Sequence, residues 1–423
     1  MGVTLEITGG RPLQGTAEIP AAKNGVLPLL AASLLCEEKV YFERVPLLSD
    51  VALCLRILQA LGTPAVRRGG TVEITPGGCG SVLPAEPVGK MRASVLFLAP
   101  VLVRAGRVET GMPGGCRLGP RPIDMHLDGL VRMGAAVRWE PERLVLEAPR
   151  GLHGIDYTLR FPSVGATETM LLAAVRARGV TVLRGAACEP EIRALADFLT
   201  ACGARITGAG SPVVCVAGVG ALGGARTVPL PDRIVASTLA CAVAACGGEA
   251  SLCRCDPFAF APVLAALRQA GCETELCAPD CVRVARSGPL RGVGRIYTGV
   301  YPAFPTDAAP LLAAALLCAG SESSVEDTVF EARFSCAEGF AAMGADVRLQ
   351  GRALEIRPAA ALHGAEVRAA DLRGGAALAI AALSAQGTSR IGDAQHILRG
   401  YENPAGMLRA LGGQASQKCS SVA

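Results

Sequence analysis

Residues 130–139 read Leu130-Val131-Arg132-Met133-Gly134-Ala135-Ala136-Val137-Arg138-Trp139, a helix-like run that ends at a glycine and continues with strand-like alternation. The pattern Leu/Phe-x-x-apolar-Gly recurs along the chain, and its six instances are Leu58–Gly62, Leu130–Gly134, Leu199–Gly203, Leu267–Gly271, Phe340–Gly344 and Leu408–Gly412. Successive glycines are separated by 72, 69, 68, 73 and 68 residues, by subtraction of their residue numbers. Spacing this regular marks an internal repeat. We therefore predict six similar units, each with a helix, a strand, a turn and a strand.

A second pattern, Leu-x-Gly, follows the second strand of most units. Its instances are Leu152-His153-Gly154, Leu222-Gly223-Gly224, Leu290-Arg291-Gly292 and Leu362-His363-Gly364. The sixth unit stops at Gly412-Gly413-Gln414-Ala415-Ser416 without a second strand, whereas the N-terminus offers Thr4-Leu5-Glu6-Ile7 followed by Leu13-Gln14-Gly15. We expect residues 1–20 to complete the last unit. Because another apolar run precedes each helix, a unit is expected to hold about two strands and two helices.

Six units divide naturally into two domains of three. The first domain is expected to span residues 22–230, and the second to combine residues 1–21 with 231–423, closed by the N-terminal strand. The chain then crosses twice, near Ala21-Ala22-Lys23 and near Pro229-Leu230-Pro231-Asp232, which predicts a hinge and a ligand cleft between domains. The alternative is a rigid solenoid of six stacked units, but the period exceeds that of common solenoid repeats.

Composition excludes several functional classes. The chain has 423 residues and a net charge of +4, too small for a nucleic-acid-binding surface. No apolar run approaches the ~18 residues of a membrane span, and residues 1–7 lack a signal-peptide pattern, so we expect a cytoplasmic protein that binds no membrane. The sequence does not indicate an oligomeric state. An odd count of 17 cysteines favours reduced thiols over disulfides.

A metal site is the competing interpretation of the cysteines. Those nearest to ligand spacing are Cys253, Cys255, Cys272, Cys277 and Cys281. No paired Cys-x-x-Cys motif occurs and only four histidines are present, so no metal site is expected. No cofactor is expected either.

Cys116 is the cysteine that core packing explains least well. It lies in Gly111-Met112-Pro113-Gly114-Gly115-Cys116-Arg117-Leu118-Gly119-Pro120-Arg121-Pro122, which cannot be regular structure. Neighbouring guanidinium groups favour thiolate over thiol, which predicts a reactive loop. The alternative is a small core residue placed beside arginines by chance, because free cysteine usually packs in cores.

Nine short motifs occur in one order along nearly the whole chain: Ala22–Pro28, Pro46–Val51, Met91–Ser94, the Cys116 loop, Pro162–Thr167, Glu189–Ile192, Leu230–Ile234, Phe304–Asp307 and Arg399–Glu402. Together they resemble the UDP-N-acetylglucosamine 1-carboxyvinyltransferase family of the EPSP synthase superfamily. The resemblance implies an α/β fold, a two-domain inside-out α/β barrel of six similar repeats. It also implies transfer of enolpyruvyl from phosphoenolpyruvate to the 3'-hydroxyl of UDP-N-acetylglucosamine, with release of phosphate, in the first committed step of peptidoglycan precursor synthesis.

The resemblance also implies roles for individual residues. Asp307 matches the base, and Cys116 matches a lid thiol that protonates the enolpyruvyl methylene or assists product release. Lys23, Arg121 and Arg399 match cations around the phosphate of phosphoenolpyruvate, and Lys23 and Arg399 count as catalytic. The full set of implied substrate-binding residues is Lys23, Asn24, Arg92, Arg121, Pro122, Ile123, Asp124, His126, Ser163, Val164, Gly165, Asp307, Val329, Arg373 and Arg399.

These residue types suit the chemistry, which needs a base, an acid and cations around two anionic groups. Desolvation in a cleft is expected to raise the pKa of Asp307, which suits proton abstraction. The alternative for Asp307 is an N-cap of the helical run from Ala308 to Leu317. For any single arginine the alternative is a solvated surface charge.

The chain departs from the family pattern at positions that bear on its turnover rate: Leu96, Val235, Ala308, Ala309, Ala332 and Leu398. Two other functions stay open. The related shikimate 3-phosphate enzyme typically carries Ser-Lys-Ser where this chain has Ala22-Lys23-Asn24, and it lacks the cysteine lid. The second alternative is a weakly active paralogue that binds the nucleotide sugar as a regulatory protein.

Overall fold

The computed structural model describes residues 2–114 and 122–420. The chain forms two compact units, which we call the terminal unit (residues 2–20 and 231–420) and the middle unit (21–114 and 122–230). Each unit is described by itself below. Two predicted site residues, Cys116 and Arg121, lie outside the described residues.

Six helices end in the same way. They are α2 (Ser49–Ala60), α5 (Asp124–Arg132), α7 (Pro190–Ala201), α9 (Ala261–Gln269), α11 (Ala337–Ala342) and α13 (Pro404–Ala410). The glycine that follows each of them has a positive φ, between 78° at Gly412 and 104° at Gly134. Glycine adopts this left-handed conformation without the steric cost that other residues have, so it ends the helix. The six-fold repeat predicted from these glycines is confirmed.

An antiparallel hairpin follows each of the first five glycines. The hairpins are β4 (Ala65–Arg68) with β5 (Thr71–Ile74), β7 (Ala136–Glu140) with β8 (Arg143–Glu147), β11 (Arg205–Thr207) with β12 (Val213–Ala217), β15 (Glu273–Ala278) with β16 (Cys281–Arg286), and β19 (Asp346–Gln350) with β20 (Ala353–Arg357).

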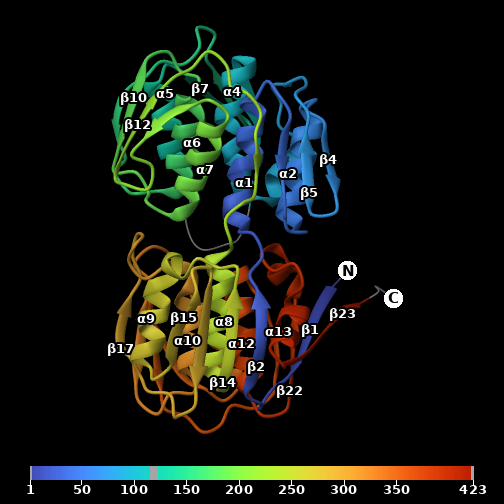
Figure 1. Ribbon diagram of the computed structural model, residues 1–423, viewed down its shortest axis with the longest axis vertical. Coiled ribbons are helices and arrows are strands. Elements are labelled where there is room, and N and C mark those ends of the chain that lie inside the picture. Colours follow the sequence, from blue (N-terminus) through green and yellow to red (C-terminus); the bar gives the residue numbers. More distant parts are fainter. Residues whose placement is uncertain (1, 115–121, 421–423) are drawn as a thin grey trace. The chain divides into compact units, whose positions relative to one another are not determined.

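In the sixth repeat the N-terminus provides the second strand. After Gly412 comes β23 (Gln414–Ser420), which pairs antiparallel with β1 (Gly2–Thr8) in a register that joins Thr8 to Gln414. In Figure 1 the blue β1 lies beside β22 and the red β23. β1 therefore occupies the place that β5, β8, β12, β16 and β20 have in the other repeats.

The second strand of each hairpin also pairs antiparallel with a strand that precedes the helix of the same repeat. The strands that precede the helices are β3 (Val40–Phe42), β6 (Arg107–Thr110), β10 (Val180–Arg184), β14 (Gly248–Cys253), β18 (Ser323–Glu326) and β22 (Thr388–Gly392). A parallel edge strand completes five of the sheets: β13 (Arg226–Thr227), β9 (Asp156–Thr158), β2 (Leu13–Glu18), β17 (Gly294–Tyr297) and β21 (Glu366–Arg368). The β6 sheet has only the bridge from Val82 to Glu109 there.

The expectation of two strands per unit is therefore wrong, because most sheets have four. The added edge strand begins near the Leu-x-Gly pattern, where the chain approaches the next repeat closely. A Cβ on Gly154 would lie 2.2 Å from the carbonyl oxygen of Val180, and one on Gly364 would lie 2.3 Å from that of Thr388. Only glycine fits at such a distance.

A second set of helices forms the interior of each unit. The middle unit has α1 (Lys23–Ala32), α4 (Leu98–Ala105) and α6 (Val164–Ala174), and the terminal unit has α8 (Arg233–Cys246), α10 (Ala309–Leu316) and α12 (Leu372–Ser384). Every residue of α10 is buried, and so is nearly every residue of α8 and α12. Helices that are apolar on all sides belong in a core. The helices thus lie inside and the sheets outside.

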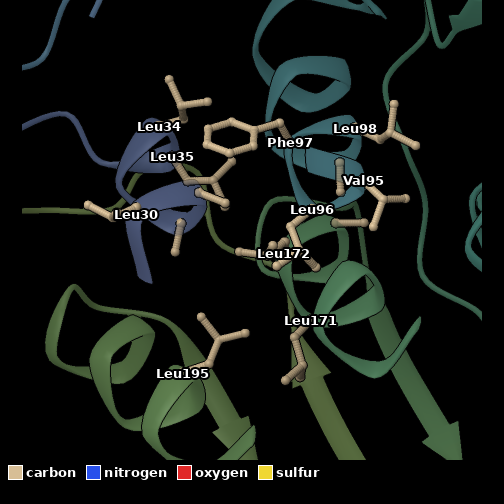
Figure 2. Close-up of a cluster of buried hydrophobic side chains, with 14 of the residues drawn as sticks. Leu30, Leu34, Leu35, Val95, Leu96, Phe97, Leu98, Leu171, Leu172 and Leu195 are labelled. Carbon is tan, nitrogen blue, oxygen red and sulfur yellow. The ribbon is translucent and has the colours of Figure 1, made fainter. Parts of the chain in front are cut away.

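Figure 2 shows part of the buried apolar cluster of the middle unit, which includes Leu30 of α1, Leu34, Phe97 and Leu172. Short helical segments complete the structure: η1 (Ser33–Leu35), α3 (Ala85–Lys90), η2 (Arg92–Phe97), η3 (Pro257–Phe260), η4 (Thr306–Ala308) and η5 (Ala394–Arg399). Among the helices described, none combines the length and the apolar character that crossing a bilayer requires.

Both chain crossings are fixed by backbone hydrogen bonds. The amide of Ala22 donates to Leu230 at 2.8 Å in the middle unit, and the amide of Asp232 donates to Pro20 at 2.8 Å in the terminal unit. The two crossings thus run next to each other. The hinge expected there stays a prediction.

Candidate active site

Asp307 lies in the short turn η4 that leads into α10. Its Oδ1 accepts a hydrogen bond from Nε of Arg373 at 3.0 Å and lies 3.8 Å from a terminal nitrogen of Arg333. Neither η4 nor α10 has a side-chain hydrogen bond at its N-cap, which is Pro305 for η4 and Ala308 for α10. The alternative interpretation of Asp307 as a helix cap is therefore wrong. The carboxylate contacts guanidinium groups instead.

The arginines also decide the protonation of Asp307. Burial by itself would raise the pKa of this carboxyl group, but the positive charges of Arg373, Arg333 and Arg233 outweigh it and hold the pKa well below its ordinary value. The expectation of a raised pKa is thus wrong for this state of the protein. Asp307 is therefore ionised at neutral pH, and in this state its carboxylate is a weaker base than an ordinary aspartate.

Arg333 is a residue that the sequence analysis missed. Its side chain is only 2% exposed, its Nε donates to the Thr306 hydroxyl at 3.0 Å and lies 3.4 Å from the buried Asp327 carboxylate, and its guanidinium lies over the Phe330 ring. The Thr306 hydroxyl in turn donates to Asp327. Burial of an arginine is costly unless carboxylates pair with it. The signal available in the sequence was an arginine only four residues after Val329, a predicted site residue.

Arg373 is held from several sides. It occupies the first turn of α12, where the Asp371 side chain accepts hydrogen bonds from the amides of Arg373 and Gly374. Arg373 also interacts electrostatically with the buried Tyr401 hydroxyl, whose oxygen lies 2.6 Å from that of Thr238. Because the Thr238 hydroxyl donates to the carbonyl of Ile234, Tyr401 donates to Thr238.

The terminal unit holds two other predicted residues, Val329 and Arg399. The amide of Val329 donates to Asp327 at 2.7 Å, which connects the Val329 segment to the same buried carboxylate. Arg399 is the last residue of η5 and is half-buried. The structure thus brings Asp307, Arg373 and, through Asp327, Val329 together.

In the middle unit, Lys23 and Asn24 open α1. The Lys23 ammonium lies 3.3 Å from the buried Asp50 carboxylate, so Pro46–Val51, which carries Asp50, supports it. Arg92 donates to the carbonyl of Pro122 at 2.9 Å, and the buried Ile123 separates Pro122 from Asp124 at the start of α5.

His126 is packed between α5 and α6. It is 5% exposed, its Nδ1 lies 2.8 Å from the Thr169 hydroxyl, and a Cβ on Gly165 would lie 3.1 Å from its ring. Burial, aided by the charge of Arg92, lowers the pKa of His126 to about 4, so its ring is neutral at pH 7. Ser163 caps α6 by accepting a hydrogen bond from the Ala166 amide at 3.3 Å, and Val164 begins that helix.

A groove of about 560 Å³ adjoins Asp124. Its lining includes Asp124, Asp128, Arg132, Tyr157 and Arg160. Arg160 pairs with the Asp124 carboxylate, a partner that the sequence analysis did not anticipate. The positive charge of Arg160 therefore orients the Asp124 carboxylate.

Most positions that depart from the family pattern lie in the core. Leu96, Val235, Ala308 and Ala309 are buried, whereas Ala332 is exposed. Leu398 is half-buried. None of these positions carries one of the polar groups described above.

Comparisons with known proteins agree with this fold. A family model described as EPSP synthase (3-phosphoshikimate 1-carboxyvinyltransferase) matches residues 7–407. The solved enolpyruvyl transferase NikO from Streptomyces tendae superposes with a TM-score of 0.89 at 24% identity, covering 99% of this chain and 100% of that one. EPSP synthase from Acinetobacter baumannii gives a TM-score of 0.75 at 18% identity, with the same coverage. The fold is that of the enolpyruvyl transferases, as predicted.

Sequence relatives are more specific. The UDP-N-acetylglucosamine 1-carboxyvinyltransferase of Finegoldia magna is 42% identical over 412 residues, 96% of this chain and 97% of the relative. The enzyme of the same name from Solidesulfovibrio magneticus is 41% identical over 399 residues, 94% of this chain and 95% of the relative. This chain is thus a carboxyvinyl-transferring enzyme of the EPSP synthase superfamily. Within it, the chain belongs to the UDP-N-acetylglucosamine 1-carboxyvinyltransferase family.

Proposed function

We propose that this chain transfers the enolpyruvyl group of phosphoenolpyruvate to the 3'-hydroxyl of UDP-N-acetylglucosamine and releases phosphate. The relatives named above support the substrates, because identity of about 40% extends over nearly the full length of both chains. The structural observation that carries the chemistry is the ionised Asp307 carboxylate between the buried guanidinium groups of Arg373 and Arg333. It combines a proton acceptor with cations for an anionic substrate.

The proposed reaction begins when the sugar hydroxyl attacks the central carbon of phosphoenolpyruvate. Asp307 accepts the hydroxyl proton while the methylene carbon gains a proton, which gives a tetrahedral intermediate that still carries the phosphate. The new methyl group then loses a proton as phosphate leaves, and the carbon–carbon double bond of the enolpyruvyl ether forms. A substrate anion at Arg373 would share the positive charge that now lowers the pKa of Asp307, so the carboxylate would become a stronger base when substrate is present. Binding of the anionic substrate would thus raise the pKa of Asp307 at the stage when this carboxylate has to accept the hydroxyl proton.

Further roles follow the family pattern. We assign Lys23, Arg121 and Arg399 to the phosphate of phosphoenolpyruvate, and Cys116 to protonation of the methylene or to product release. For the nucleotide sugar we propose Asn24, Arg92, Pro122, Ile123, Asp124, His126, Ser163, Val164, Gly165 and Val329, with the Arg121-Pro122 region beside the uracil. His126 is neutral, so it would contribute a hydrogen bond or packing rather than charge.

Phosphoenolpyruvate and nucleotide sugars are cytoplasmic metabolites, which supports a cytoplasmic location. The product is a peptidoglycan precursor, so the reaction would serve wall growth, cell shape and cell division.

Phosphate release is the direct test. The full chain is mixed with phosphoenolpyruvate and either UDP-N-acetylglucosamine or shikimate 3-phosphate, and we expect release only with the nucleotide sugar. Release with shikimate 3-phosphate would identify the related synthase activity. Tight binding of the nucleotide sugar without release would identify the regulatory paralogue. No observation of the chain favours either alternative.

A further inference from the structure

Two of the cysteines that came closest to ligand spacing face each other in the terminal unit. Cys253 is the last residue of β14 and Cys281 is the first residue of β16, and the antiparallel register places them directly opposite each other. Among the described residues, no group of three His, Cys, Asp or Glu side chains could hold a metal ion.

The geometry of the pair suits a covalent bond. The two Sγ atoms lie 2.6 Å apart. Opposed residues on antiparallel strands have Cβ atoms about 4.5–5.5 Å apart, and disulfides need about 3.5–4.5 Å with a bond of about 2.05 Å. The two ranges of Cβ separation meet at about 4.5 Å, and the sulfur atoms need to approach by only about 0.5 Å more to reach bonding distance, without a change of register.

We propose that Cys253 and Cys281 are a thiol–disulfide exchange site, which a small external disulfide of the glutathione type converts into a cross-strand disulfide. The half-buried Cys253 is the accessible member, whereas Cys281 is 8% exposed. The site is independent of the proposed transferase function, and its test has a separate readout.

The exchange runs in two steps. The Cys253 thiolate attacks one sulfur of the external disulfide, which forms a mixed disulfide and releases one thiolate. Cys281 then loses its proton and attacks the Cys253 sulfur, forming the intramolecular bond and releasing the second thiolate. The two protons end on the released thiols, so the protein pair is oxidised by two electrons and the external disulfide is reduced by two.

The surroundings support this order. Burial and the hydrogen bond with Cys253 raise the pKa of Cys281 to about 12, so Cys281 keeps its proton until the mixed disulfide has formed. At Cys253 the sheet meets β2, since the Ile19 amide donates to the Cys253 carbonyl at 2.9 Å. The bond would close a loop of residues 254–280, which contains η3 and α9.

A third thiol provides an internal comparison. Cys277 is exposed and sits where the register between β15 and β16 shifts, between Leu276 and Ala278. No strand position faces it across the ladder, so we expect Cys277 to form a mixed disulfide with the external thiol and not to join the pair. The buried Cys36 and Cys202 thiols of the middle unit, 3.7 Å apart, are a second comparison. Their burial should exclude the reagent.

The experiment treats the reduced full chain with oxidised glutathione, alkylates the remaining thiols, and maps peptides by mass after digestion without reductant. We expect a linked peptide pair containing Cys253 and Cys281, lighter than the two thiol peptides by two hydrogen atoms and lost on treatment with dithiothreitol. Cys36 and Cys202 should be alkylated only after unfolding.

Variants sharpen the result. In Cys281→Ser, Cys253 should retain glutathione as a mixed disulfide, whereas Cys277→Ser should leave the linked pair unchanged. The proposal is overturned if wild-type protein gives no Cys253–Cys281 link while Cys277 and Cys419 acquire glutathione, or if Cys277 forms the link. The wild-type map decides the matter even if a variant fails to fold.

Discussion

Nε of Arg373 donates to Oδ1 of Asp307 at 3.0 Å, which joins the first turn of α12 to the turn that leads into α10. Arg333 approaches the same oxygen from the loop after β18. The protonation of Asp307 is therefore governed by two buried guanidinium groups more than by desolvation. Any anion that binds these arginines acts on the carboxylate as well.

Replacing Asp307 by asparagine should remove the proton acceptor and keep the shape of the side chain. We expect phosphate release to fall roughly 10²–10⁴-fold, the usual cost of losing a general base, with nucleotide-sugar binding nearly intact. Steady-state kinetics and calorimetric binding measure the two effects. Asp346→Asn, at an exposed carboxylate of β19, is the matched control and should keep wild-type turnover. Near-normal turnover in Asp307→Asn would refute the assignment.

Tyr401 should position Arg373. Tyr401→Phe retains the buried ring but removes the hydroxyl that interacts electrostatically with Arg373 and donates to Thr238. Polar interactions with charged groups contribute about 1.5–3 kcal/mol, so we expect kcat/KM for phosphoenolpyruvate to fall roughly 10- to 100-fold, mostly through KM. Thr238→Ser keeps a hydroxyl and is expected to preserve activity. An unchanged KM in Tyr401→Phe would show that Arg373 holds its place without the tyrosine.

The lowered pKa of His126 predicts that the unfolding free energy of the middle unit depends on pH. Its pKa is about 4 when folded, against 6.5 for an ordinary histidine, so the unfolded chain binds a proton that the folded chain does not. Stability should be constant above pH 6.5 and decrease as the pH falls toward 4, by about 3 kcal/mol in total. Urea unfolding at pH 7.5 and pH 5 measures the loss.

The His126→Gln variant should lose most of this pH dependence. His153→Gln, at an exposed histidine, is the control and should keep it. If both variants respond to pH as the wild type does, another group is responsible.

Some features of the fold were visible in the sequence because local geometry sets them. The six glycines each follow a helix and have a positive φ. Because this backbone conformation favours glycine at a single position, the glycines recur at regular intervals in the sequence. The pairing of β1 with β23 was also foreseeable, since the missing strand of the last repeat has a match at the N-terminus. Edge strands such as β13 and β21 were not, because two or three residues acquire strand geometry only by pairing with the next repeat.

The candidate site was less predictable for a related reason. Asp307 itself was identified from its motif, whereas its partners Arg333 and Arg373 come from other segments and meet it only in the folded unit. The sequence analysis expected a raised pKa for Asp307, and this was wrong because it did not foresee the two arginines beside the carboxylate. Arg160 was missed for the same reason, since its pairing with Asp124 depends on how β9 lies against α5.

Gly203 allows the cost of the repeated helix end to be measured by itself. Its φ is +101°, and a Cβ there would meet no atom within 4 Å, so Gly203→Ala adds backbone strain without a steric clash. We expect a loss of about 1–2 kcal/mol in unfolding free energy, the usual cost of left-handed backbone for a residue with a Cβ. Gly220→Ala is the control, because Gly220 also has open space around it but no positive φ. Equal unfolding midpoints for the two variants in urea would mean that the repeated geometry of this helix end does not require glycine.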